Sequence, residues 1–297
     1  MEKNLSEIKP IKKLVICISG GLDSFGAYCW AKNMFCPKNG MDFDKEVALL
    51  QVVDTGCPYW EKEVNVMDTL YGKYNINPQI FRVVISGYRA LGIAEDDHVI
   101  LGRNAMLASI AVRLGLTVWI CGTSFENNSG MVDKNHNFFK SISDTLSYAC
   151  GYKRPLIDVH GMPYTKVYSP FQGTMFFETP LAVSEKHGII RWLEVSGVKS
   201  WRKTTSCFHP KYLRCGVCST CGKRFVYEKY VELEDGIIFK PGTKLEDTYR
   251  ESPLNNVYLQ KTIIAMKNAL INKDFSRYLE ERIQVYKRVL DNYNLWA

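Results

Sequence analysis

The sequence predicts an α/β protein with a doubly wound, mostly parallel sheet. Short apolar segments rich in β-branched residues alternate with segments of helical spacing, and two of these apolar segments are followed by glycine and an acidic residue. Such alternation favours parallel strands, because each helix returns the chain to the edge where the previous strand began. Ligands of these sheets bind at the carboxyl ends of the strands, so we expect the functional residues there.

The expected strands and helices follow one another through the first half of the chain. Strands are expected at 14–18, 47–53, 79–85 and 117–121, and helices at 25–34, 59–71, 104–114 and 136–150. After about residue 188 the pattern changes, and helical spacing returns at 257–271 and 275–293. We therefore expect one domain at 1–235 and a helical extension at 236–297, with a linker at 236–253.

Composition limits the class of protein. With 46% hydrophobic and 23% charged residues, the 297-residue chain has the balance of a soluble globular protein. No apolar run approaches the roughly 20 residues of a membrane span, and the polar first 13 residues lack a signal-peptide core. We therefore expect a cytoplasmic protein with no membrane partner. The formal charge of +7 suits anionic ligands and permits, without requiring, nucleic acid.

A glycine-containing turn links the first expected strand to the first helix. Its residues are Ser19, Gly20, Gly21, Leu22, Asp23 and Ser24. Glycines permit a tight turn whose N–H groups face outward, and the start of the helix adds partial positive charge. The serines offer hydroxyl groups, and Asp23 suits a metal ion beside a phosphate. The turn therefore predicts a phosphate site, and it is not a Walker loop because Gly-Lys-Ser/Thr is missing.

The Ser-Gly-Gly-x-Asp-Ser motif at 19–24 resembles the PP-loop of N-type ATP pyrophosphatases. The resemblance implies an adenine nucleotide alpha hydrolase-like fold and an enzyme that splits ATP, bound with Mg²⁺, into AMP and pyrophosphate. It implies that the six loop residues bind ATP together with Asp54, which ends the second strand, and Arg103. Catalytic roles are expected for Asp23, Ser24 and Arg103, the last by balancing charge that develops on the phosphates.

Four of the ten cysteines form a cluster. Cys207, Cys215, Cys218 and Cys221 supply the four thiolates of a closed tetrahedral zinc site, which predicts structural zinc held at 207–221. An iron–sulfur cluster and unligated thiols are the alternatives. The apolar surroundings of Cys17, Cys29 and Cys121 predict small core residues, and the remaining cysteines are isolated.

A PP-loop followed by Cys-x7-Cys-x2-Cys-x2-Cys resembles the 7-cyano-7-deazaguanine synthase family, QueC. The Gly-Arg-Asn at 102–104 and the segments at 129–140 and 170–178 are similar to further family motifs, so the resemblance spans roughly 14–224. It implies a substrate site formed by Asn104, Ser129, Gly130, Asp133 and Glu178. Family members adenylate 7-carboxy-7-deazaguanine, form an amide with ammonia and activate the amide to the nitrile. They tend to form homodimers.

Several departures from the family pattern leave alternatives open. Thr55 follows Asp54 where a tyrosine is usual, Met131 stands in the substrate motif, and Phe176 replaces a usual lysine. One alternative is therefore a QueC-like enzyme that joins a deazaguanine to a protein amine in antiviral defence.

A second alternative is a tRNA-modifying thiolase or lysidine-type ligase, motivated by eight basic residues and one acid at 199–229. Nucleic acid is not favoured, because no tRNA-binding appendage is recognisable. A third is a catalytically silent scaffold, which the complete loop motif disfavours.

Overall fold

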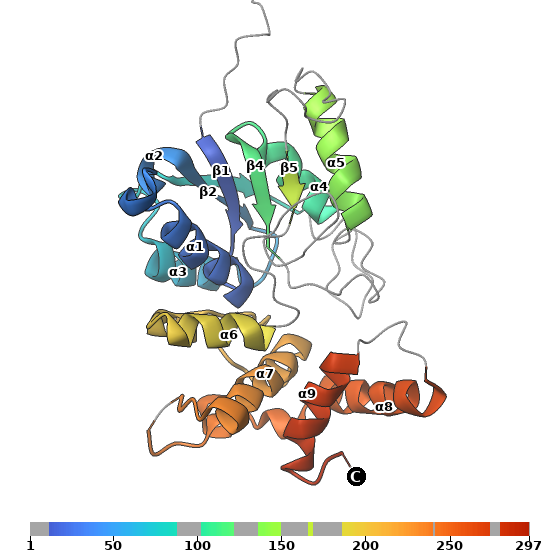
Figure 1. Cartoon of the computed structure of the whole chain (residues 1–297). Helices are drawn as coiled ribbons and strands as arrows, with labels where there is room; N and C mark the ends of the chain where they lie inside the picture. The colour runs from blue at the N-terminus through green and yellow to red at the C-terminus, as the bar shows by residue number, and fades with distance from the viewer. Residues whose placement is uncertain are drawn as a thin grey trace, which may run out of the picture.

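A single parallel sheet organises the first half of the chain (Figure 1). The computed structural model describes residues 12–87, 102–121, 136–149, 166–168, 186–239, 241–273 and 280–296. Within them five parallel strands have the order β3-β2-β1-β4-β5. They are β1 (Lys12–Ile18), β2 (Val47–Asp54), β3 (Ile80–Ile85), β4 (Gly115–Ile120) and β5 (Lys166–Tyr168). The chain winds outward from β1 in both directions, so the doubly wound prediction is confirmed.

Helices cover both faces of this sheet. They are α1 (Leu22–Met34), α2 (Phe43–Glu46), α3 (Trp60–Tyr71), α4 (Arg103–Ala111) and α5 (His136–Ala149). The expected start of α1 at residue 25 is wrong by three residues. Gly21 is the N-cap in extended conformation, so the second half of the glycine turn already forms the first helical turn.

Alternate side chains of β1 enter two separate cores. Leu14, Ile16 and Ile18 pack in one buried cluster with α1, α3 and the helices that follow residue 186. Val15 and Cys17 point to the other face, where α4 and α5 cover them. The alternation follows from the two-residue period of a strand. Because both faces are covered, residues 14–18 of the strand are all apolar and buried, as parallel strands usually are, and only the two lysines at its start are accessible.

The described residues from 186 onward form a helical unit below the carboxyl edge of the sheet in Figure 1. It contains α6 (Lys186–Val195), α7 (Ser219–Asp235), α8 (Val257–Asn272) and α9 (Glu280–Asp291), with short 3₁₀ helices at Lys199–Lys203, Leu245–Thr248 and Pro253–Asn255. Another short 3₁₀ helix, Pro37–Asn39, lies between α1 and α2. The sequence analysis did not predict α6 or α7. The amphipathic helices at the C-terminus are present; α9 ends at Asp291, two residues before the expected end, and its expected start at 275 lies outside the described residues.

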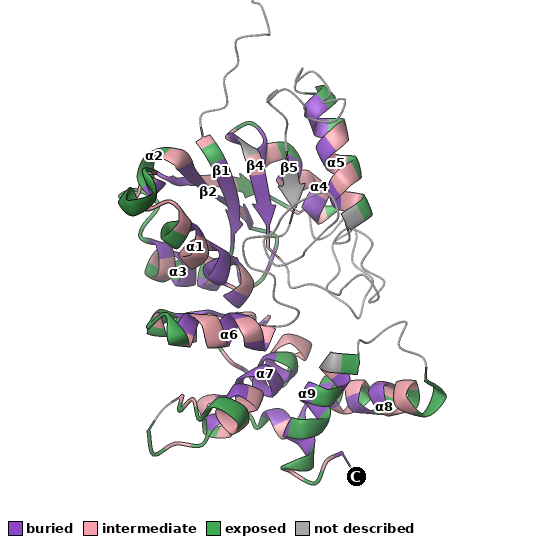
Figure 2. Cartoon of the chain, in the orientation of Figure 1, coloured by how far each residue is buried: buried purple, intermediate pink, exposed green. Residues whose placement is uncertain are grey.

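The C-terminal helices bury their apolar faces inside the chain, as the purple inner sides in Figure 2 show. Met266 of α8 and Ile283, Tyr286 and Leu290 of α9 belong to the same cluster as α7 and the sheet, and Leu270 packs partly buried against it. Tyr278 lies outside the described residues. Within the predicted linker at 236–253 the side chain of Leu245 is fully buried, so this segment packs on the protein at that residue. The boundary at residue 235 stays a prediction.

Among the helices that the structure describes, none combines the length and apolar character that crossing a membrane requires.

Candidate functional site

The glycine turn presents the start of α1 at the carboxyl edge of the central strand. β1 ends at Ile18 and α1 begins at Leu22. No side chain caps this helix, and the first main-chain bond of the helix runs from the N–H of Phe25 to the carbonyl of Gly21, 3.2 Å away. The N–H groups of the first turn therefore point out of the helix end, where they favour an anion.

Ser24 stabilises the conformation of the glycine turn by hydrogen bonds. Its side chain is buried, and its Oγ accepts a hydrogen bond from the Ser19 N–H at 3.0 Å and lies 2.9 Å from the Ser19 carbonyl oxygen. The Tyr71 hydroxyl of α3 lies 3.2 Å from the same Oγ and donates to the Ser19 carbonyl at 3.0 Å. Ser24 thus contacts the turn, whereas the Ser19 side chain stays exposed.

Gly20 lies between two segments that are distant in the sequence. A Cβ added to it would lie 3.2 Å from Cγ1 of Val66 in α3 and 3.4 Å from Cγ2 of Thr205. The Thr205 N–H donates to the Gly20 carbonyl oxygen at 2.7 Å. The turn is therefore supported on one side by α3 and on the other by the segment that leads to the cysteine cluster.

Asp23 is paired with a lysine that the sequence analysis missed. Nζ of Lys186, the first residue of α6, lies 2.7 and 2.6 Å from the two carboxylate oxygens of Asp23. Both side chains are partly exposed. A lysine at the start of a helix opposes the helix dipole, so this ion pair compensates an otherwise unfavourable position. The pair places the ammonium group of Lys186 beside the expected anion site.

Asp54 lies on the same edge of the sheet. It ends β2, whose strand neighbours are β1 and β3, and its Oδ1 accepts the Gly56 N–H at 3.0 Å. The Thr55 hydroxyl and main-chain N–H both contact the Ile85 carbonyl, and a Cβ on Gly56 would approach the Gly87 nitrogen to 2.9 Å. The Asp-Thr-Gly turn therefore packs closely on the end of β3, where glycine is required.

Arg103 and Asn104 open α4 after Gly102, which has a left-handed φ of 70°. α4 ends one short turn before β4 begins at Gly115, which pairs with Lys12 at the amino edge of the sheet. The start of α4 therefore lies toward the opposite, carboxyl edge. Asn104 is buried and Arg103 is partly exposed.

The other predicted substrate residues lie outside the described residues. These are Ser129, Gly130, Asp133 and Glu178. Their placement relative to the loop stays a prediction.

The four clustered cysteines meet at one point. The Sγ atoms of Cys207, Cys215, Cys218 and Cys221 all lie within 4.8 Å of one another, and the Cys215 and Cys221 sulfurs are 3.9 Å apart. A tetrahedral zinc ion with bonds of about 2.3 Å requires sulfur–sulfur edges of about 3.8 Å. The donor set therefore fits a closed four-thiolate site, and the predicted cluster of four cysteines that could hold a metal ion is confirmed.

Lys62 of α3 links the cysteine loop to the sheet, and no sequence pattern marks this residue. Its side chain is nine-tenths buried. Nζ donates to the Cys207 carbonyl, to the His209 carbonyl at 2.5 Å and to the Tyr212 carbonyl at 3.2 Å. Three carbonyl acceptors saturate the ammonium group, which accounts for the burial of this lysine.

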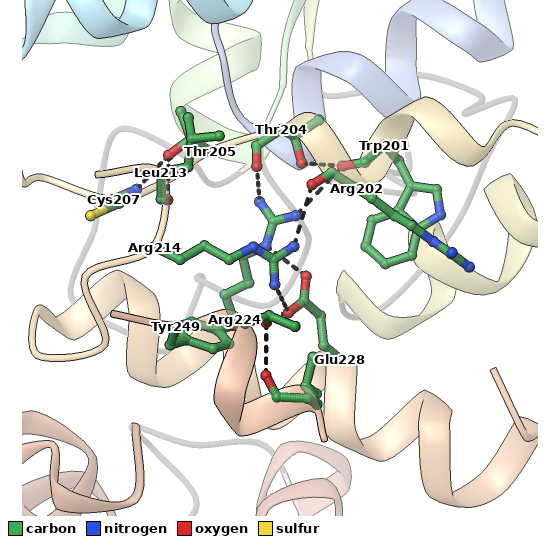
Figure 3. Close-up of polar contacts among 12 residues, drawn as sticks. Trp201, Arg202, Thr204, Thr205, Cys207, Leu213, Arg214, Arg224, Glu228 and Tyr249 are labelled. Carbon is green, nitrogen blue, oxygen red and sulfur yellow. Dashed lines mark hydrogen bonds and ion pairs between the residues drawn. The ribbon is translucent and has the colours of Figure 1, made fainter. Parts of the chain in front are cut away.

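A buried carboxylate, Glu228, gathers the residues around the cysteine loop (Figure 3). It is fully buried and accepts hydrogen bonds from Arg214 Nη1 at 2.5 Å, Arg224 Nε at 2.8 Å and the Tyr249 hydroxyl at 2.9 Å. We call these four residues the Glu228 network. Burial opposes ionisation, but the two guanidinium charges hold the pKa of Glu228 below its ordinary value.

The basic stretch at 199–229 is largely paired with acidic side chains. Five of its eight basic residues form ion pairs with Glu194, Glu228 or Glu232; they are Lys199, Arg202, Arg214, Arg224 and Lys229. Charges paired in this way are not available to phosphates of a nucleic acid. The observation that motivated a tRNA substrate therefore has a structural explanation.

Comparison with known proteins identifies the family. The model described as "Queuosine biosynthesis protein QueC" matches residues 13–230. Three curated relatives are similar over most of their length. A 7-cyano-7-deazaguanine synthase of Clostridium kluyveri is 25% identical over 77% of this chain and 99% of its own, and one of Pyrococcus horikoshii is 23% identical over 72% and 91%.

The third relative is 7-cyano-7-deazaguanine synthase 2 of Colwellia psychrerythraea, 25% identical over 72% of this chain and 92% of its own. No solved structure matches the chain significantly. None of the three relatives has a name from antiviral defence. The matched region contains the glycine turn and all four clustered cysteines, and the chain belongs to the QueC family, as its motifs predicted.

Proposed function

We propose that this protein is an AMP-forming, ATP-dependent enzyme that converts 7-carboxy-7-deazaguanine and ammonia to 7-cyano-7-deazaguanine. The observation that carries the proposal is the uncapped start of α1 beside a glycine turn and a carboxylate, in a chain of the QueC family. The carboxylate of the substrate attacks the α-phosphorus of ATP and pyrophosphate leaves. Ammonia then displaces AMP to give the amide and loses a proton. A second adenylation, on the amide oxygen, allows loss of AMP and two protons to form the nitrile.

The residues of the carboxyl edge have separate roles in this proposal. The N–H groups of the first turn of α1 and the Ser19 hydroxyl hold the departing pyrophosphate. Asp23 holds the Mg²⁺ that accompanies ATP, and its ion pair with Lys186 keeps a cation at that position in the free protein. Ser24 stabilises the conformation of the turn. Arg103 balances charge on the phosphates.

The remaining predicted residues complete the site as proposals. Asp54 binds on the nucleotide side, and Asn104, Ser129, Gly130, Asp133 and Glu178 form the deazaguanine side. The four thiolates hold zinc, and because no ligand position stays open the metal is structural. A homodimer is the expected assembly.

The test is a product analysis with defined acceptors. The protein is incubated with ATP, Mg²⁺ and 7-carboxy-7-deazaguanine, with and without ammonium, and the products are analysed by mass spectrometry. We expect AMP and pyrophosphate in both arms, and amide and nitrile only with ammonium. An adduct on a protein amine would identify the other acceptor, and formation of ADP alone would refute the assignment of the loop.

A further inference from the structure

The peptide that joins Gly20 to Gly21 has an orientation that matters for an anion site. In a trans peptide the carbonyl and the N–H point in opposite directions. A rotation of this peptide by half a turn would change φ of Gly21 from −82° to about +98°, which glycine tolerates and other residues resist. The same rotation would exchange an N–H group for a carbonyl oxygen on the side where phosphates are expected.

Thr205 fixes one of the two orientations. Its main-chain N–H donates to the Gly20 carbonyl at 2.7 Å, so this oxygen points toward Thr205. On the opposite side of the same peptide, the Gly21 N–H donates to Ser19 Oγ at 3.2 Å, within the turn. A phosphate oxygen can replace this hydroxyl as acceptor without any rotation of the peptide.

Thr205 is itself held on three sides, as Figure 3 shows. Its Oγ1 donates to the Leu213 carbonyl at 2.8 Å and accepts the Cys207 N–H at 3.2 Å. The carbonyl of the preceding residue, Thr204, accepts Nη1 of Arg224 at 2.7 Å. Because Arg224 is bound to Glu228 and Cys207 is a cluster thiol, both the Glu228 network and the cysteine cluster determine where the Thr205 N–H points.

We propose that Thr205 is a positioning residue of the phosphate site, whose main-chain N–H prevents the Gly20–Gly21 peptide from turning its carbonyl oxygen toward the anion. The cysteine cluster and the Glu228 network then have a function beyond stability, because they place this N–H donor. The inference rests on the proposed nucleotide site. It concerns neither the acceptor nor the deazaguanine.

The variant Thr205→Pro removes the main-chain N–H together with the Oγ1 hydroxyl that bonds Leu213 and Cys207. The preceding Thr204 has φ −65° and ψ 150°, a conformation that proline accepts in the residue before it. Calorimetric titration with inorganic pyrophosphate, ATP and adenosine measures the effect. We expect about tenfold weaker binding of pyrophosphate and ATP, unchanged binding of adenosine, and unchanged zinc content. A merely structural role would weaken all three ligands together.

Two further variants separate the hydrogen bond from other effects of proline. Thr205→Ala keeps the N–H, so its loss of pyrophosphate affinity should be at least about fivefold smaller than that of Thr205→Pro. Adding Gly21→Ala to Thr205→Pro disfavours the positive φ of the rotated peptide and should restore part of the affinity. A Cβ there would lie 3.3 Å from Ser19 Oγ, a contact that a small side-chain shift relieves.

Each of these affinity measurements either supports or overturns the role of Thr205. Pyrophosphate affinity of Thr205→Pro within twofold of the wild type, or no recovery in the double variant, would overturn the inference. If Thr205→Pro does not fold, Arg224→Lys decides, because it keeps a charge for Glu228 but loses the bond to the Thr204 carbonyl. Retained affinity in that variant would also overturn it. A wild-type protein that binds neither pyrophosphate nor ATP would instead refute the proposed function.

Discussion

Replacing Glu228 by glutamine tests the largest electrostatic contribution in the helical unit. The carboxylate is fully buried between two guanidinium groups and one hydroxyl, at 2.5, 2.8 and 2.9 Å. Glutamine has nearly the same volume but no charge, and its amide NH₂ cannot accept from a donor. Removing one partner of a buried ion pair costs about 3–5 kcal/mol, because the remaining charge stays buried. We expect this loss in the free energy of unfolding.

Glu232→Gln is the matched control. It lies one helical turn further along α7 and pairs with Lys229 at 2.6 Å, but its side chain is 23% exposed. A partly exposed pair of this kind contributes at most about 1 kcal/mol. Urea unfolding followed by circular dichroism compares the two variants with the wild type at neutral pH. A Glu228→Gln variant that lost no more stability than Glu232→Gln would refute the electrostatic argument.

The same carboxylate gives a pH dependence with a definite sign. The pKa of Glu228 is lowered in the folded protein, so the stability it contributes is present above the glutamate pKa of the unfolded chain, about 4.3. This contribution is lost as the pH falls from there through the lowered folded pKa. The stability difference between wild type and Glu228→Gln should therefore shrink on acidification. A stability difference that grew toward low pH would contradict the lowered pKa of Glu228.

Three further changes test the site and the helical unit. Elemental analysis of the wild type should find about one zinc per chain. Cys218→Ser should lose this metal and have a lower melting temperature, because metal binding is coupled to folding. Undiminished zinc in the variant would contradict the four-thiolate site. Lys62→Met should speed removal of zinc by a chelator about tenfold through loss of three carbonyl bonds, whereas the exposed Lys45→Met should not. Deleting residues 253–297 should give insoluble protein, because the deletion exposes the apolar face of α7 that contains Phe225. A soluble, zinc-loaded product would show that α8 and α9 are dispensable.

The sequence by itself determined the elements whose signal is local. The apolar run at 14–18, the glycine turn after it and the spacing of Cys215, Cys218 and Cys221 are each contained within a few residues. Strand periodicity, helix-start chemistry and metal-ligand spacing act over that same range. The parallel sheet, the glycine turn at its carboxyl edge and the cluster of four cysteines were predictable for this reason. The helix α7 was missed, because its residues follow a cysteine loop and carry charges that resemble an exposed surface.

Only the tertiary structure decided which distant residues complete the site. Lys186 reaches Asp23 across 163 residues of sequence, and Lys62 reaches the Cys207 carbonyl across 145. The residues around each lysine in the sequence do not predict its partner, since a single cation forms no periodic or spaced pattern. Folding also buried Arg214 and Arg224, which the sequence presented as a basic stretch, around Glu228. Their charges were known from the sequence, but the low-dielectric contacts that give those charges their energy exist only once the chain brings the partners together.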